Sequence, residues 1–174
     1  MSNNIILIGF MAVGKGRTAR ELAAQTGRFA VDTDDLIESF AKKKIRKIFN
    51  LCGEATFRQM EAAAADWLEK NVSNTIVSTG GGFFMVGNLQ RLGTVIYLHA
   101  GIEAIYTAIS EHPNSTKKMK KRPLLQDLGR ARQLYYKRLP LYRRAADYEI
   151  DVEGKSSAEV AENIVQDLES QKST

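Results

Sequence analysis

The chain has 174 residues, of which 44% are hydrophobic and 26% charged, which is typical of one globular domain with a single core. These proportions exclude disordered, fibrous and membrane classes. The longest apolar stretch near the start, 5–13, contains Gly9 and has no basic region before it, so it indicates a strand and not a signal peptide. We therefore expect a cytoplasmic protein without membrane contact, and the single cysteine, Cys52, agrees with a reducing compartment.

The formal net charge of +5 is unevenly distributed. Five of the six residues in 117–122 are basic, whereas 149–169 is rich in acids. A local basic patch suits a small anionic ligand. No aromatic residue interrupts 117–122 and no recognition motif accompanies it, so we expect no binding of nucleic acid.

The first predicted elements form a strand, helix, strand unit. Residues 4–8 read as a strand buried on both faces and ending at Gly9, and 16–25 as a helix that stops at Gly27. A second strand is predicted over 29–32. The unit spans about thirty residues, which fits a parallel crossover.

The rest of the chain continues this alternation. Helices are predicted over 33–43, 45–51, 54–70, 102–110, 130–146 and 156–168, and strands over 75–79, 94–98 and 148–152. The helix over 54–70 carries a predicted core stripe of Phe57, Met60, Ala64, Trp67 and Leu68.

Three local features complete this interpretation. Pro140 is expected to kink or restart its helix, and Ser156 or Ser157 to cap the last one. Residues 111–121, with few apolar side chains and prolines nearby, are expected to form a mobile loop within a lid at about 111–125. The predicted fold class is α/β: one domain over 1–174, a three-layer sandwich with a mostly parallel five-stranded sheet.

A phosphate loop is predicted between the first strand and the first helix. Gly9-Phe10-Met11-Ala12-Val13-Gly14-Lys15 has the spacing G-x-x-x-x-G-K in that context. Glycines let backbone N–H groups face phosphate oxygens, and the helix N-terminus adds the positive end of its dipole. We expect Lys15 to bridge the β- and γ-phosphates of a nucleotide.

The residue after Lys15 departs from this pattern. Ser or Thr usually follows and ligates Mg²⁺, but this chain has Gly16 and then Arg17. Thr18 lies about 200° further around the helix and is a poor substitute. Three explanations compete: magnesium held by other groups and phosphate oxygens, a protein that binds nucleotide but transfers slowly, or a deliberately altered site. Because Mg²⁺ often needs few protein ligands, we expect weakened metal binding with retained activity.

Two carboxylates lie at the carboxyl end of the second predicted strand, where open α/β sheets bind ligands. We expect Asp32 to hold magnesium through water, and Asp34 to orient an attacking hydroxyl and accept its proton. The alternative is that Thr33 or Asp34 simply caps the next helix.

Glycines and arginines complete the candidate acceptor site. Gly80, Gly81 and Gly82 follow the third predicted strand and indicate close approach of the backbone to a ligand, or a loose loop. Arg58 and Arg138 interrupt apolar helical stretches, so each either clamps a carboxylate or lies on the surface.

Six segments together resemble the shikimate kinases in order and spacing, over nearly the whole chain. They are Gly9 to Lys15, Asp32-Thr33-Asp34, Gly53-Glu54 with Phe57-Arg58 and Glu61, Ser78-Thr79-Gly80-Gly81-Gly82, Arg122-Pro123-Leu124-Leu125, and Arg138-Leu139-Pro140-Leu141-Tyr142. The resemblance implies a nucleoside-monophosphate-kinase-like fold with a closing lid. It also implies transfer of the ATP γ-phosphate to the 3-hydroxyl of shikimate, with ATP and Mg²⁺ required.

The resemblance further implies roles for individual residues. Arg58 and Arg138 take the shikimate carboxylate, Glu61 orients Arg58, and Asp34 and Gly81 contact the same substrate. Arg122 reaches the ATP phosphates from the lid and acts in catalysis with Lys15 and Asp34. The nucleotide-binding set is Gly9, Ala12, Val13, Gly14, Lys15, Gly16, Arg17, Thr18, Arg122 and Lys155, the last near adenine.

The chain also departs from the family pattern. Ala12 replaces a common glycine, and Gly16 and Arg17 replace hydroxyl residues, which affects the metal site and the rate and leaves the acceptor side intact. We expect a monomer that binds shikimate and ATP. A kinase of another hydroxy acid such as gluconate, or a nucleotide-binding protein with impaired transfer, are the alternatives.

Overall fold

The computed structural model describes residues 3–120 and 123–170, and within them one sheet has five strands, all parallel. The spatial order is β2-β3-β1-β4-β5, so the α/β expectation is confirmed. In chain order the elements are β1 Ile5–Ile8, α1 Lys15–Thr26, β2 Ala30–Asp32, α2 Thr33–Ala41, α3 Ile45–Asn71, β3 Ile76–Ser78, the 3₁₀ turn η1 Phe83–Met85, α4 Leu89–Leu92, β4 Thr94–His99, α5 Ile102–Ser110, α6 Ser115–Lys120, η2 Pro123–Gln126, α7 Leu128–Ala145, β5 Tyr148–Asp151 and α8 Ser157–Ser170.

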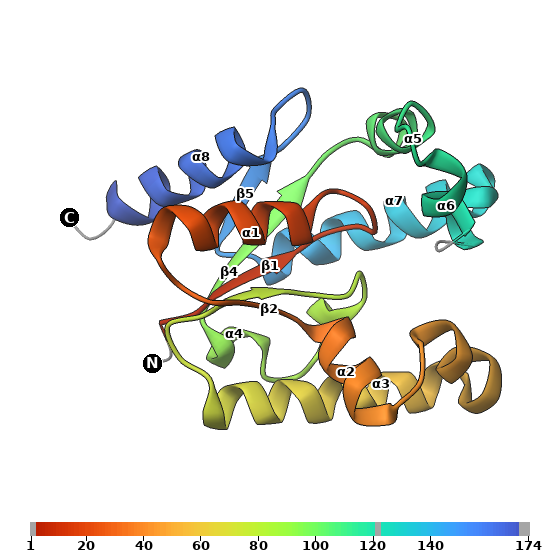
Figure 1. Cartoon of the computed structure of the whole chain (residues 1–174), viewed down its shortest axis with the longest axis horizontal. Helices are drawn as coiled ribbons and strands as arrows, with labels where there is room; N and C mark the ends of the chain where they lie inside the picture. The colour runs from red at the N-terminus through yellow and green to blue at the C-terminus, as the bar shows by residue number, and fades with distance from the viewer. Residues whose placement is uncertain (1–2, 121–122, 171–174) are drawn as a thin grey trace.

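Alternation along the strands builds two separate hydrophobic layers. In β1, Ile5 and Leu7 pack with α1 and α8 on one face of the sheet, while Ile6 and Ile8 pack with α3, α4 and α7 on the other. All four of these β1 residues are buried, as expected for a central parallel strand covered by helices. Figure 1 shows α1 and α8 lying together on one side of the sheet, with α3 on the opposite side.

The helix ends follow the sequence signals. Helix α1 stops at Gly27, whose left-handed φ of 69° lets its N–H bond the Ala23 carbonyl. At the start of α8, the Ser156 hydroxyl accepts from the Glu159 N–H at 3.2 Å, and the Glu159 carboxylate accepts from the Ser156 N–H at 2.7 Å. This reciprocal capping box confirms Ser156 as the capping residue.

Helix α3 contains one break and one exposed aromatic residue. Gly53 has φ 80° and ψ 171°, so the helical segments before and after it are distinct, as the sequence indicated. Phe57 and Leu68 are buried, but Trp67 is 47% exposed. Placing Trp67 in the core stripe was wrong, because the buried face passes through Glu61, Ala65 and Leu68 at helical spacing.

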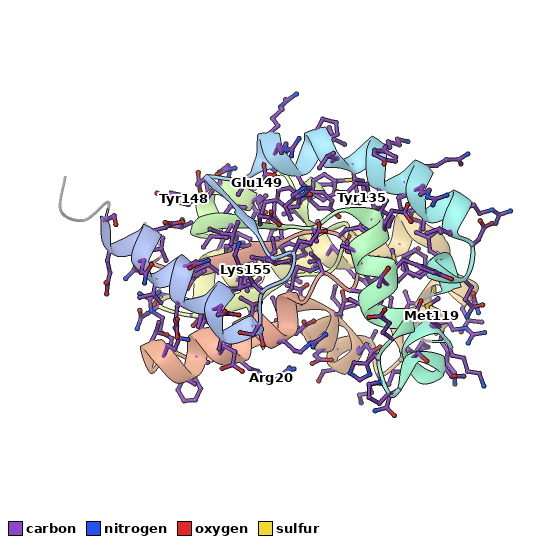
Figure 2. The ribbon with its side chains drawn as sticks, turned by 90° about the horizontal axis from the view of Figure 1, so that it is seen from above. Arg20, Met119, Tyr135, Tyr148, Glu149 and Lys155 are labelled. Carbon is purple, nitrogen blue, oxygen red and sulfur yellow. The ribbon has the colours of Figure 1, made fainter. Side chains whose placement is uncertain are left out.

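The expected loop at 111–121 is partly helical. Helix α6 occupies Ser115–Lys120, its Met119 side chain packs against the main core, and the Gln126 side chain donates to the Met119 carbonyl at 3.1 Å. This lysine-rich helix thus contacts the core through Met119, which is labelled in Figure 2. Pro140 does not restart the helix, since α7 continues through it. Among the described residues, no helix is sufficiently long and apolar to cross a membrane.

Candidate functional site

The carboxyl ends of the parallel strands converge on one cavity. A volume of about 470 Å³ is lined by the phosphate loop, the end of β2, the segment after β3 and part of α5. Its lining includes Met11, Ala12, Gly14, Lys15, Gly16, Arg17, Arg20, Asp32, Asp34, Ser78, Thr79, Gly80, Gly81, Ala108 and Ile109. Residues predicted from three separate motifs therefore share one site.

The phosphate loop is held in a turn that only glycine fits at its first position. Gly9 has φ 150°, and a side-chain Cβ there would lie 2.6 Å from the Leu98 carbonyl oxygen. Lys15 is buried, and its ammonium donates to the Gly9 and Phe10 carbonyls at 2.8 and 3.0 Å. Gly14 is the N-cap residue of α1, and no side chain of the described residues caps that end. Backbone N–H groups and a lysine thus border an anion-sized space.

Ala12 adopts a backbone conformation that costs an alanine free energy. Its φ of 67° lies in the left-handed region, which is unfavourable for residues with a Cβ by about 1–2 kcal/mol. We expect Ala12→Gly to raise the free energy of unfolding by about 1 kcal/mol and the melting temperature by about 2–4 °C. Ala24→Gly on the exposed face of α1 is the matched control and should have the opposite sign. Destabilisation by both substitutions, measured by thermal melting, contradicts the prediction.

Gly16 faces the cavity with room for a side chain. A Cβ at this position would lie 3.8 Å from Ser78 Oγ and 3.8 Å from Arg20 Nη1, which are ordinary contact distances. Arg17 and Arg20 are exposed and both line the cavity; Arg20 is labelled in Figure 2. The glycine is therefore not imposed by crowding.

Asp32 and Asp34 take different positions at the start of α2. One oxygen of Asp32 accepts from the Asp34 N–H at 2.9 Å, so Asp32, and not Thr33 or Asp34, caps the helix. Its other oxygen accepts from the Ser78 hydroxyl at 2.7 Å. Thr33 is buried, and its hydroxyl accepts from the Gly80 N–H at 3.0 Å. These bonds join the end of β2 to the segment after β3.

The Asp34 carboxyl lies in a setting that favours its neutral form. Burial, with the negative charge of Asp32 next, raises the pKa of Asp34 from 3.8 to about 6, while Lys15 opposes the change. Asp34 Oδ1 has no protein hydrogen-bond partner within the described part of the chain. A carboxyl with this pKa and a buried oxygen that no protein group bonds is suited to receive a proton from a bound hydroxyl near neutral pH.

Two arginines approach the three glycines. Arg58 bonds Glu61 at 2.5 Å and Glu54 at 2.7 Å, and burial raises the pKa of Glu61 although Arg58 opposes it. Arg138 donates to the Gly81 carbonyl at 3.0 Å, and the Tyr142 hydroxyl donates to the same oxygen. Neither arginine is a free surface residue, and their carboxylate and carbonyl partners hold the guanidinium groups in place.

Gly82 sets the position of Arg58. A Cβ on this buried residue would lie 2.7 Å from Arg58 Cζ, so Gly82→Ala should displace the guanidinium. We expect KM for a carboxylated acceptor to rise about tenfold or more, the loss of one charge-assisted hydrogen bond. Gly87→Ala is the matched control, because nothing lies within 4 Å of its Cβ position. Equal kinetics for the two variants contradict the prediction.

A second cavity of about 320 Å³ adjoins the first on the far side of the phosphate loop. Its lining shares Ala12, Gly14, Arg17 and Ala108 with the first cavity. It adds residues of α1, α5 and the 152–155 loop, among them Thr18 and Ala104. Lys155 lines it, and its ammonium donates to the Asp151 carbonyl at 2.6 Å (labelled in Figure 2). Arg122, expected in the lid, lies outside the described residues.

Comparison with known proteins gives a consistent result. The shikimate kinase family profile matches residues 11–169. The chain belongs to the shikimate kinase family. It is 38% identical to the shikimate kinase of Helicobacter hepaticus over 163 residues, covering 94% of both chains, and 37% identical to that of Caldanaerobacter subterraneus over 169 residues, covering 93% of this chain and 94% of the relative.

Solved structures of shikimate kinases share the fold. The enzyme from Acinetobacter baumannii, in complex with shikimate, has a TM-score of 0.87 at 32% identity and covers 99% of this chain and 96% of its own. The enzyme from Aquifex aeolicus has a TM-score of 0.79 at 28% identity, with 97% and 98% covered. As a member of this family the chain is an ATP-using kinase of shikimate.

Sequence reasoning missed two contributors to the site. Tyr142 binds the Gly81 carbonyl from a completely buried position, and Ser78 binds Asp32. Both stood inside segments that resemble the family, but neither had a chemical role assigned. The signal for Ser78 was its place at the end of a strand beside Asp32, which becomes visible only with the strand order.

Proposed function

We propose that this shikimate kinase transfers the γ-phosphoryl group of ATP to the 3-hydroxyl of shikimate, with Asp34 as the proton acceptor. The observation that carries the proposal is a single cavity bordered by the phosphate loop and by Asp34, whose pKa of about 6 suits a base near neutral pH. The shikimate oxygen forms a bond to phosphorus, the bond from phosphorus to the bridging oxygen breaks, ADP leaves, and Asp34 takes the hydroxyl proton.

The remaining residues position the reactants. Lys15 and the N–H groups at the start of α1 are proposed to hold the β- and γ-phosphates, which their position at a helix N-terminus supports. The second cavity, with Lys155 at its edge, is the proposed space for the nucleoside. Arg58 and Arg138 are proposed to bind the shikimate carboxylate, since both guanidinium groups are held beside the three glycines.

The cavity also contains oxygen ligands suited to Mg²⁺. Asp32 and Ser78 lie side by side in it, and hard oxygen donors of this kind match the preference of the ion. The described residues contain no group of three or more His, Cys, Asp or Glu that holds a metal alone, which fits an ion bound through few protein groups, water and phosphate. When bound, magnesium neutralises charge on the transferring phosphoryl group.

The decisive experiment measures ADP release with shikimate and with other hydroxy acids, including gluconate. We expect shikimate to have the highest kcat/KM, because the chain belongs to the shikimate kinase family and a relative with the same fold binds shikimate. The two arginines favour a carboxylated acceptor but do not by themselves distinguish shikimate from gluconate. An equal or better rate with gluconate overturns the assignment of the acceptor. If the protein binds nucleotide but forms no ADP with any acceptor, the result favours the alternative of impaired transfer, which Gly16 supports.

A further inference from the structure

A side-chain hydroxyl close to Gly16 lies at the end of β3, whereas Gly16 itself lies in α1. Gly16 has no side-chain oxygen, yet the place where its Cβ would stand is 3.8 Å from the Ser78 hydroxyl oxygen. Ser78 is 2% exposed and lines the same cavity as Gly16, Lys15 and Asp32. The cavity therefore already contains a hydroxyl beside the position where the phosphate loop lacks one.

The hydrogen bonding of Ser78 leaves its oxygen suited to a cation. Its hydroxyl donates to Asp32 Oδ2 at 2.7 Å, so its proton is directed at a carboxylate. A hydroxyl that donates its proton retains two lone pairs as acceptor capacity. The other Asp32 oxygen caps α2, which fixes the carboxylate that in turn orients the serine, as an outer partner orients a metal ligand.

The backbone holds this arrangement rigidly. Ser78 is the last residue of β3, and it pairs in parallel register with Asp32 of β2 and with Leu7 of β1. Sites on strands keep their geometry better than sites on loops. The hydroxyl of Thr79, the next residue, donates to the Leu7 carbonyl of β1 at 2.8 Å. Of these two neighbouring residues, only Ser78 therefore bonds Asp32.

We propose that Ser78 supplies the side-chain hydroxyl ligand for the nucleotide-bound divalent cation, in place of the Ser or Thr that Gly16 replaces. The inference rests on the proposed function, because the cation must arrive with a nucleotide phosphate. It explains how the chain dispenses with the loop hydroxyl. In this chain the hydroxyl ligand would come from the end of β3 instead of the first turn of α1, and Asp32 would orient it through their hydrogen bond.

The test uses Mn²⁺ as the probe and the full-length chain with ADP. Binding is measured by the loss of the free Mn²⁺ electron paramagnetic resonance signal, without shikimate and without turnover. We expect Ser78→Ala to weaken Mn²⁺ binding about tenfold or more. Ser73→Ala, exposed near the opposite end of β3, is the matched control and should bind as the wild type does.

A rescue experiment separates a ligand from a merely structural serine. Gly16→Ser should restore Mn²⁺ affinity in the Ser78→Ala background to within about threefold of wild type, and should change affinity much less in the wild-type background. The 3.8 Å spacing leaves room for that new side chain. Metal-free ADP affinity, measured in EDTA, should be equal in all variants, which shows that the phosphate loop is folded.

Three results overturn the proposal. Unchanged Mn²⁺ binding in Ser78→Ala excludes the serine, and loss that Gly16→Ser does not rescue assigns it a structural role. Wild-type ADP binding that is independent of the cation and is lost in Arg20→Gln shows that Arg20 supplies the charge instead. In each case the wild type still binds ADP, so the proposed function stands. Absence of any ADP binding by the wild type refutes the proposed function itself.

Discussion

We expect Asp34→Asn to lower kcat for shikimate phosphorylation by about 10²–10⁴-fold, the range for loss of a general base. The amide retains the shape of Asp34 and its place at the start of α2 but accepts no proton. Asp35→Asn, on the exposed neighbouring carboxylate, is the control and should keep wild-type kinetics. A kcat within threefold of wild type in Asp34→Asn refutes the role of this residue as base.

The same substitution should stabilise the folded chain, with a defined pH dependence. The folded pKa of about 6 exceeds the ordinary value of 3.8. Ionisation of Asp34 therefore lowers the free energy of unfolding, and this loss develops as pH rises from about 4 to 6. The full difference corresponds to about 3 kcal/mol. We expect Asp34→Asn to melt about 5 °C or more above wild type at pH 8 and to show little difference below pH 4. A constant difference across this range contradicts the prediction.

The pH dependence of wild-type kinetics should show the titration of Asp34. If the Asp34 carboxylate is the base, kcat/KM for shikimate rises with pH through about 6 and then levels, because only the ionised form accepts the proton. The lower limb should be missing from the residual activity of Asp34→Asn. An identical lower limb in that variant assigns the titration to another group.

Arg138→Met should lower kcat/KM for shikimate by about 10²-fold or more, since removing one partner of a partly buried, hydrogen-bonded charge pair costs about 2–5 kcal/mol. ADP affinity should change much less than kcat/KM, because Arg138 bonds the Gly81 carbonyl, whereas the nucleotide phosphates are expected at Lys15 and the N-terminus of α1. The control is Arg132→Met on the same helix, whose guanidinium bonds Glu103 on the surface at 2.6 Å. Equal losses in the two variants, or a loss of ADP affinity in Arg138→Met, contradict a carboxylate-binding role.

Local signals predicted the elements of this fold better than their packing. The G-x-x-x-x-G-K spacing, Gly27 and Ser156 act through backbone geometry within a few residues, and each lies where expected. Trp67 was misplaced because several faces of a long helix offer apolar residues, and the sheet decides which is buried. Helix α6 depends on the contact of Met119 with a distant core, which its lysine-rich composition hides.

In the candidate site as well, the residues that follow strand ends could be predicted from the sequence, whereas those that depend on strand pairing or packing could not. Asp32, Asp34 and Lys15 follow strand ends, so the parallel sheet brings them together once its class is known. Ser78 needed the pairing of β2 with β3, because the segment Ser78-Thr79-Gly80-Gly81-Gly82 does not indicate that the serine hydroxyl bonds Asp32. Tyr142 needed the stacking of its ring on Tyr97 to direct its hydroxyl at Gly81.

The two carbonyl partners of Lys15 make phosphate capture an exchange. In the structure its ammonium satisfies the Gly9 and Phe10 oxygens from within the loop. While it keeps both of these bonds, the ammonium has at most one of its three N–H donors to offer a phosphate. A phosphate that draws the ammonium further from these oxygens exchanges bonds to neutral carbonyls for charge-assisted bonds to an anion. In return, the loop is ordered before the ligand arrives, and little conformational entropy remains to be lost on binding.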